Sequence, residues 1–165
     1  MDAVTGELNR LVPDIAQVLR ITLRLLAALA VGTAIGLQRE LTHKTAGLRT
    51  HMLVALGTGL FVIGAAESGM ATESLGRVIQ GIATGIGFLG GGAILKLTDQ
   101  QEVHGMTTAA GIWMTAAASA TAAMGQIAVA LVGTVLGLVV LIAVRKWEKE
   151  FEHHRVRADK EKLSP

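Results

Sequence analysis

The chain lacks cysteine and tyrosine, and it has only two prolines, three phenylalanines and 17% charged residues among 165. The absence of cysteine excludes disulfides, thiolate metal sites and a cysteine nucleophile. The scarcity of charge excludes an ordinary soluble domain, because 51% of the residues are hydrophobic and the mean hydropathy is +0.51. The 20 glycines are spread through stretches of Leu, Val, Ile and Ala. This composition predicts an integral membrane protein whose helices approach one another closely.

Long stretches without charge predict where the membrane spans lie. Residues 105–144 hold no Lys, Arg, Asp, Glu or His, and these forty positions can cross a membrane twice, with a turn at Met124-Gly125-Gln126. Earlier apolar runs supply three more spans. We predict an all-α integral membrane bundle of five transmembrane helices, at about 21–38, 51–66, 78–96, 105–123 and 127–144. An amphipathic segment at 1–20 precedes this domain over 21–144, and a charged tail at 145–165 follows it.

The distribution of positive charge predicts the orientation of the bundle. An odd number of spans places the two ends of the chain on opposite sides of the membrane. Eleven Lys and Arg residues then lie on one side, and only Arg10, Arg20, Arg24 and Arg77 lie on the other. By the positive-inside rule, the C-terminus is cytoplasmic and the N-terminus is outside.

A glycine-rich segment at 84–92, TGIGFLGGG, contains the spacing G-x-G-x-x-G. A dinucleotide site would need a βαβ unit and an acidic residue about 20 positions later, and no acid stands there. Small residues four positions apart instead predict a helix that packs closely on several sides. Two alternatives stay open for the triple glycine: it provides packing contacts, or it breaks the helix and opens the backbone to a ligand. The predicted packing or partner surface comprises Gly81, Gly85, Gly87, Gly90, Gly91 and Gly92.

The loop between the first two predicted spans is basic. Arg39, Lys44 and Arg49 are expected to anchor it at the cytoplasmic surface, and Glu40 can pair with Lys44 one helical turn later if the helix persists. The alternative is a docking surface for a partner or for anionic lipid. The loop motif comprises Arg39, Glu40, Gly47, Leu48, Arg49, Thr50 and His51.

Few polar side chains fall within the predicted spans. We expect Arg24 to extend to the outer surface, and the alternative turns it inward toward Gln80 and Thr84. No carboxylate lies inside a span, the histidines lack ligand spacing, and no nucleophile is paired with a base. We therefore expect no catalytic site, no metal site and no cofactor. The residues that could line a path or pack are Arg24, Gln80, Thr84, Thr107, Thr108 and Trp113.

Four segments together resemble the MgtC/SapB family of small bacterial inner-membrane proteins, and the resemblance covers about residues 20–145. Its most specific pieces are GLRTH, GIGFLG, and GMTTAA followed by Trp113. The resemblance implies a multi-pass protein of the bacterial inner membrane that acts in adaptation to magnesium limitation and, in pathogens, in virulence. It also implies restraint of the F-type ATP synthase. The segments are RLLAALAVGTAIGLQRE at 24–40, AGLRTHMLVALGTGLF at 46–61, RVIQGIATGIGFLGGGAILK at 77–96 and VHGMTTAAGIWMTAAASATAAMGQ at 103–126.

The resemblance also implies a function and a set of partners. The chain looks like a short form, without the soluble C-terminal domain that longer members carry. We expect a non-enzymatic protein that contacts membrane lipids and a membrane-protein partner such as the F-type ATP synthase, or a second copy of itself, and no nucleic acid. The alternative is a small transporter or channel, in which the triple glycine with Thr107 and Thr108 lines a path for an ion or small solute. Because the spans lack an acid, we prefer the first function.

Overall fold

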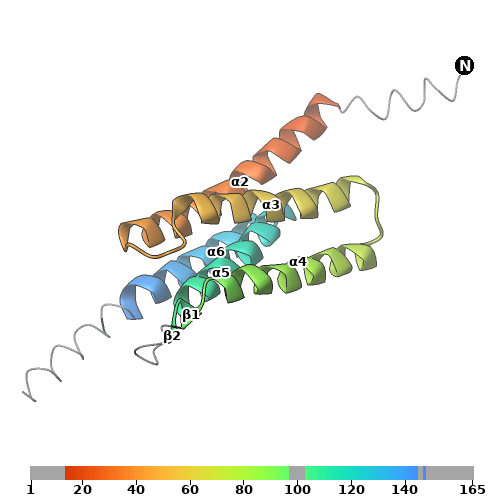
Figure 1. The fold of residues 1–165 in the computed structure, drawn as a ribbon. Coiled ribbons are helices and arrows are strands. Elements are labelled where there is room, and N and C mark those ends of the chain that lie inside the picture. The colour runs from red at the N-terminus through yellow and green to blue at the C-terminus, as the bar shows by residue number, and fades with distance from the viewer. Residues whose placement is uncertain (1–13, 97–102, 145–146, 148–165) are drawn as a thin grey trace, which may run out of the picture.

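A computed structural model describes residues 14–96, 103–144 and 147. Helices arranged in up-and-down order make up almost all of this part of the chain (Figure 1). A short antiparallel hairpin separates the third helix from the fourth, and it pairs Leu95 with His104 and Lys96 with Val103. The predicted all-helical fold is confirmed, with this hairpin as an addition. The elements are α2 (Ile15–Leu41), α3 (Leu48–Glu67), α4 (Thr72–Gly92), β1 (Leu95–Lys96), β2 (Val103–His104), α5 (Met106–Ala123), α6 (Ile127–Val139) and the π-helix η1 (Val140–Val144).

Several helix boundaries differ from the sequence prediction, most clearly those of α2 and α4. α2 begins at Ile15, so the second part of the predicted amphipathic segment is continuous with the first span. α4 ends at Gly92, and the prediction that this helix reaches residue 96 is wrong. After the hairpin the chain enters α5 at Gly105, which has a φ of +94° and lies against the carbonyl of Ala93, where a Cβ would collide. Residues 1–13 and the tail, apart from Trp147, lie outside the described residues.

The triple glycine at the end of α4 remains helical. The backbone N–H of Ala93 donates to the carbonyl of Leu89 at 3.1 Å, so the helical pattern passes through all three glycines. The alternative in which they break the helix is therefore wrong. Gly90 is buried, and a Cβ at this position would lie 3.6 Å from the Ala109 side chain on α5.

The core of the bundle is built around α5. This helix packs against α2, α3, α4 and α6, whereas α4 packs mainly against α5. It can occupy the centre because its buried face consists mainly of small residues, including Gly111, Ala116 and Ser119, with Ile112 as the one large side chain. The predicted turn after α5 is confirmed, since Gly125 has a φ of +85° and its N–H donates to the carbonyl of Ala122 at 2.9 Å.

Three helical segments are long and apolar enough to cross a membrane, namely Ile15–Leu41, Leu48–Glu67 and Ile127–Val144. α4 and α5 do not reach this level of hydropathy. For α5 the reason is its content of Ala, Thr, Ser and Gly, which suits a helix covered by protein rather than by lipid. Membrane crossing by α4 and α5, and the orientation of the bundle, stay predictions.

The closest helix contact in the bundle joins α2 to α3. A Cβ on Gly32 would lie 2.6 Å from both the Ala55 Cβ and the carbonyl oxygen of His51. A Cβ on Gly36 would lie 2.9 Å from the His51 Cβ and 3.0 Å from the Leu48 Cα. These two glycines are four residues apart, and they form the small-xxx-small contact that lets two backbones touch.

Gly32→Ala is expected to lower the free energy of unfolding by about 1–3 kcal/mol, because the added methyl group meets backbone that cannot move aside. The matched control is Gly64→Ala on α3, where a Cβ would meet nothing within 4 Å. Helix propensity makes that change neutral or stabilising. Unfolding in mixed detergent micelles, followed by circular dichroism, measures both. Equal effects of the two substitutions would contradict the close contact.

Candidate functional site

Buried polar side chains form a line through the interior of the bundle, and we call them the polar seam. Thr108, Thr115 and Ser119 share one face of α5, since their spacing of seven and four residues follows the helical repeat. Arg39 from α2 and His51 from α3 meet this face. All five side chains are buried: Arg39, His51, Thr108, Thr115 and Ser119.

Arg39 lies in the last turn of α2 and is only 3% exposed. Its Nη2 donates a hydrogen bond to Thr108 Oγ1 at 2.7 Å. The helix ends directly after it, because the N–H of Lys44 donates to the Arg39 carbonyl at 3.1 Å and that of His43 to the Glu40 carbonyl at 3.0 Å. The prediction that Arg39 is a surface anchor is wrong. Its charge lies between α2 and α5.

His51 lies in the first turn of α3 and is fully buried. Its Nδ1 is 2.7 Å from Thr115 Oγ1. The Thr115 hydroxyl donates its only proton to the carbonyl of Gly111 at 2.9 Å, so it accepts the proton carried by Nδ1. A Cβ on Gly111 would lie 3.6 Å from His51 Cε1, and the glycine therefore gives the imidazole its space.

The far end of the seam joins α5 to α2. Ser119 Oγ donates to the carbonyl of Ala28 at 3.4 Å. The three connections, at Thr108, Thr115 and Ser119, hold α5 in register with both of its neighbours. In a membrane interior such polar contacts join helices where the hydrophobic effect cannot.

The other members of the loop motif shape the start of α3. Glu40 Oε2 accepts the backbone N–H of Leu48 at 2.9 Å, which satisfies one free amide of that helix. The predicted pairing of Glu40 with Lys44 is wrong, because α2 ends at Leu41 and Lys44 lies beyond it. A Cβ on Gly47 would collide with the Glu40 carboxylate. Arg49 and Thr50 are exposed and remain available to a partner.

Most of the residues predicted to line a path do not come together, although Thr107 and Thr108 line one pocket at the start of α5. Arg24 lies at the opposite end of α2 from Arg39, and its Nη2 would be 3.6 Å from a Cβ on Gly125. Its alternative placement against Gln80 and Thr84 is wrong, since both are exposed on α4 and Thr84 Oγ1 donates to the Gln80 carbonyl. Thr107 and Trp113 are exposed on α5, whereas Thr108 is buried.

Sequence reasoning missed the burial of His51 and the roles of Thr115, Ser119, Gly32 and Gly36. The printed sequence contains a signal for the hydroxyl residues of α5 and another for the two glycines of α2. Hydroxyl residues recur along α5 at the helical repeat, and Gly32 and Gly36 are four residues apart in the first predicted span.

The seam is poorly suited to a hard cation. It offers one guanidinium, one imidazole and three hydroxyl groups, and no carboxylate. Within residues 14–96 and 103–144, no three His, Asp or Glu side chains gather so that they could hold a metal ion. Mg²⁺ favours carboxylate and phosphate oxygens, which these groups do not supply.

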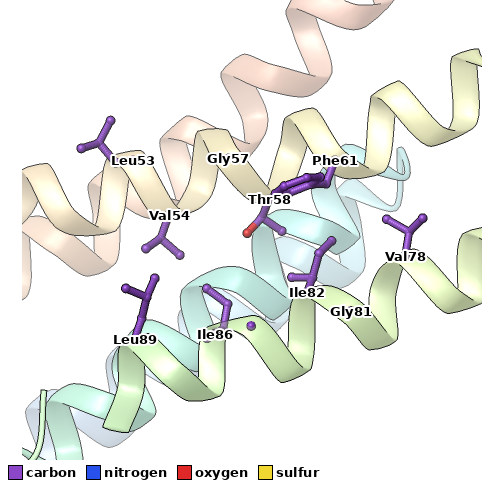
Figure 2. A pocket seen from close by; sticks show the side chains of 11 residues that line it. Leu53, Val54, Gly57, Thr58, Phe61, Val78, Gly81, Ile82, Ile86 and Leu89 are labelled. Atoms are coloured by element: carbon purple, nitrogen blue, oxygen red, sulfur yellow. The ribbon is translucent and has the colours of Figure 1, made fainter. Parts of the chain in front are cut away.

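A second feature is an apolar groove of about 700 Å³ between α3 and α4 (Figure 2). Phe61 and Leu53 from α3 and Val78 and Leu89 from α4 line it. A Cβ on Gly57, Gly81 or Gly85 would meet nothing within 4 Å. The groove is therefore open along its length. Its lining is Leu53, Val54, Gly57, Thr58, Phe61, Val78, Gly81, Ile82, Gly85, Ile86 and Leu89.

Comparison with known proteins identifies the family. The MgtC family matches residues 25–150, which include the seam, the groove and the close contact of α2 with α3. The chain belongs to the MgtC family. This membership confirms the family expected from the sequence.

Several members of the MgtC family are similar over most of this chain. Protein SrpB of Synechococcus elongatus is 39% identical over 79% of this chain and 78% of its own length. Protein MgtC of Salmonella typhimurium LT2 is 37% identical over 85% of this chain and 59% of its own length. YhiD of Escherichia coli K12, whose description proposes magnesium transport, is 40% identical over 71% of this chain and 56% of its own length. The chain thus spans under two thirds of MgtC and YhiD, and no solved structure matches it.

Thr108→Val is expected to lower the free energy of unfolding by about 1.5–3 kcal/mol, because it removes the acceptor of a buried charged donor. Thr107→Val is the matched control, since the neighbouring side chain is exposed. Its effect should stay within about 0.5 kcal/mol. Chemical unfolding in detergent measures both variants, and a Thr108 variant as stable as its control would contradict the hydrogen bond to Arg39.

Proposed function

We propose that this protein is a non-enzymatic, multi-pass protein of the bacterial inner membrane that takes part in adaptation to magnesium limitation. It acts by binding a partner protein within the membrane, through α4 and the groove beside it. The observation that carries this proposal is the composition of the outward face of α4, which differs from that of a helix surrounded by lipid.

α6 illustrates a lipid-facing surface. Its exposed positions are large and aliphatic, such as Val132, Leu136 and Val139, each between 53% and 60% exposed. The exposed positions of α4 include Gln80, Thr84 and five glycines of the predicted surface, together with the large side chains of Phe88 and Leu89. A row of small and polar residues is typical of a helix that packs against another helix in lipid.

The glycines of the predicted surface divide into three groups. Gly81 and Gly85 face the groove between α3 and α4. Gly87, Gly91 and Gly92 are exposed with no neighbour within 4 Å of a Cβ, and Gly90 packs on α5. A partner helix could therefore approach the α4 backbone closely in the groove, with Phe61 at its edge.

The F-type ATP synthase is the first partner to consider, because resemblance to the MgtC/SapB family implies it. The exposed Arg49 and Thr50 lie at the start of α3 and could extend the contact beyond the groove. A second copy of this chain is the other partner to consider. A role in virulence would follow from either contact only in a host-associated bacterium.

The second candidate function is transport of an ion or small solute, and the polar seam is the observation that favours it. The description of YhiD adds magnesium as a substrate to consider. The charge of Arg39 inside the seam opposes a path for Mg²⁺, although Thr107 and Thr108 both line a pocket at the start of α5. The partner function therefore comes first.

Gly85→Leu is expected to reduce capture of the membrane partner at least severalfold, because a leucine side chain fills the groove that the partner helix enters. Gly76→Leu is the matched control, since Gly76 lies on the same helix, outside the groove, with nothing within 4 Å of a Cβ. A photocrosslinking residue at position 89 in living cells measures capture of ATP synthase subunits or of a second copy. Equal capture by both variants would refute the groove as the contact.

Transport has its own measurement. Proteoliposomes loaded with a magnesium-sensitive dye should show no flux above that of protein-free vesicles. Saturable flux that depends on the protein would favour the transporter over the partner function.

A further inference from the structure

We propose that the α3–α4 groove receives α4 of a second copy of this chain, and that Gln80 of one copy forms a hydrogen bond with Thr58 of the other. The inference rests on the proposed function, because it names the occupant of the groove which that function uses. It depends on two polar side chains, one inside the groove and one on the outward face of α4. Neither side chain has a hydrogen-bond partner among the residues that the structure describes.

Thr58 is the exception among the threonines that lie beyond the first turn of a described helix. Six others donate their hydroxyl protons to the carbonyl four residues earlier, at 2.7 to 2.9 Å, namely Thr22, Thr33, Thr84, Thr115, Thr121 and Thr134. Thr58 makes no such bond within the described chain, although it is only 4% exposed. It lines the groove, and Figure 2 shows its oxygen on the side of α3 that faces α4. Because a buried hydroxyl without a partner is costly, the groove suits an occupant that carries a hydrogen-bonding group.

Gln80 presents a complementary group on the outward face of α4. Its side-chain amide is exposed, and it can both donate and accept hydrogen bonds. Gln80, Thr84 and Phe88 are spaced four residues apart and are all exposed, so they form one stripe along the helix. The Thr84 hydroxyl already donates to the Gln80 carbonyl at 2.9 Å. The Gln80 amide is therefore the polar group that this stripe offers to a neighbouring helix.

The two polar groups lie at nearly the same depth in the bundle. Thr58 is nine residues before Glu67, where α3 ends. Gln80 is eight residues after Thr72, where α4 begins. At about 1.5 Å per residue, the two lie about 13 Å and about 12 Å from the end at which these helices are joined, which is near the middle of a hydrocarbon core about 30 Å thick. Copies that insert in the same direction are related by an axis along the membrane normal, so Gln80 of the partner copy reaches the level of Thr58.

The stripe also fits the shape of the groove. The groove has a volume of about 700 Å³, and three of its lining residues are glycines with open space beside them. Phe88 is 85% exposed, and it lies at the depth of its neighbour Leu89, which lines the groove. The partner's Phe88 can fill this end of the groove while the partner's Gln80 bonds to Thr58. A lipid acyl chain also suits an apolar groove, but it carries no hydrogen-bonding group at the middle of the membrane.

Cross-linking between copies tests the contact, and the absence of cysteine from the chain makes it specific. Differently tagged Thr58→Cys and Gln80→Cys chains are coexpressed, and native membranes are treated with a mild oxidant. We expect a disulfide that joins the two tags. The matched control pairs Thr58→Cys with Gly76→Cys, which lies about one turn nearer the start of α4 and outside the groove, and this pair should give no disulfide.

Removal of either polar group is expected to weaken self-association about tenfold. Each variant, Thr58→Val or Gln80→Leu, removes two symmetric hydrogen bonds, and one such bond between membrane helices is worth about threefold. Energy transfer between labelled copies in liposomes, over a range of protein-to-lipid ratios, measures the effect. Both substitutions in one chain should cost little more than either alone, since they remove the same bonds. Thr84→Val is the matched control, because its hydroxyl is satisfied inside α4, and it should leave self-association unchanged.

A disulfide between positions 58 and 80, with self-association that both variants weaken and the control does not, supports the inference. Absence of this disulfide overturns it, and so does equal self-association of Thr58→Val, Gln80→Leu and Thr84→Val. In either case the comparison of Gly85→Leu with Gly76→Leu still decides whether the groove binds another membrane protein. Failure of the second-copy contact is therefore distinguishable from failure of the proposed function.

Discussion

The whole arrangement depends on the narrow cross-section of α5. Four helices can surround a fifth only if the central one has small side chains, and α5 meets this condition with alanine, glycine, serine and threonine on its buried face. The same small side chains cannot supply much apolar area. The polar seam makes up for this small apolar area. Arg39 and His51 are hydrogen-bonded to hydroxyl groups on α5 and fix the rotation of this helix and its position along its axis. The small and hydroxyl-bearing residues of α5 thus provide both the close packing and the polar contacts.

The seam also accounts for the residues around it. Gly32 and Gly36 bring α3 against α2, and this contact brings His51 into the interior beside Gly111. Glu40 then caps α3 over Gly47, where no side chain has room. The segment GLRTH at 47–51 therefore holds the start of α3 against α2, and Arg49 and Thr50 are its exposed residues.

Much of the fold was predictable, and the reasons for the failures are local. Apolar runs and the turn at Gly125 located the helices, because length and charge constrain a membrane chain strongly. The hairpin was missed because it depends on the positive φ of Gly105, and a sequence does not reveal a backbone angle. Arg39 looked like a surface anchor because its burial depends on Thr108, which is 69 residues away along the chain. The six glycines at 81–92 of α4 were predicted as a packing or partner surface, and an added Cβ would meet nothing within 4 Å at five of them.

The hydrogen bonds described above for the polar seam join α5 to α2 and α3 and not to α4. The seam joins α5 to α2 and α3, and α4 is attached mainly through its packing on α5 and through its two connecting segments. The bundle therefore consists of a cross-linked body and one helix that lies against it. α4 instead contributes Ile86 to the apolar core beside Ile112 and Ala116, so a change in its tilt would disturb apolar packing before it disturbed any of these hydrogen bonds.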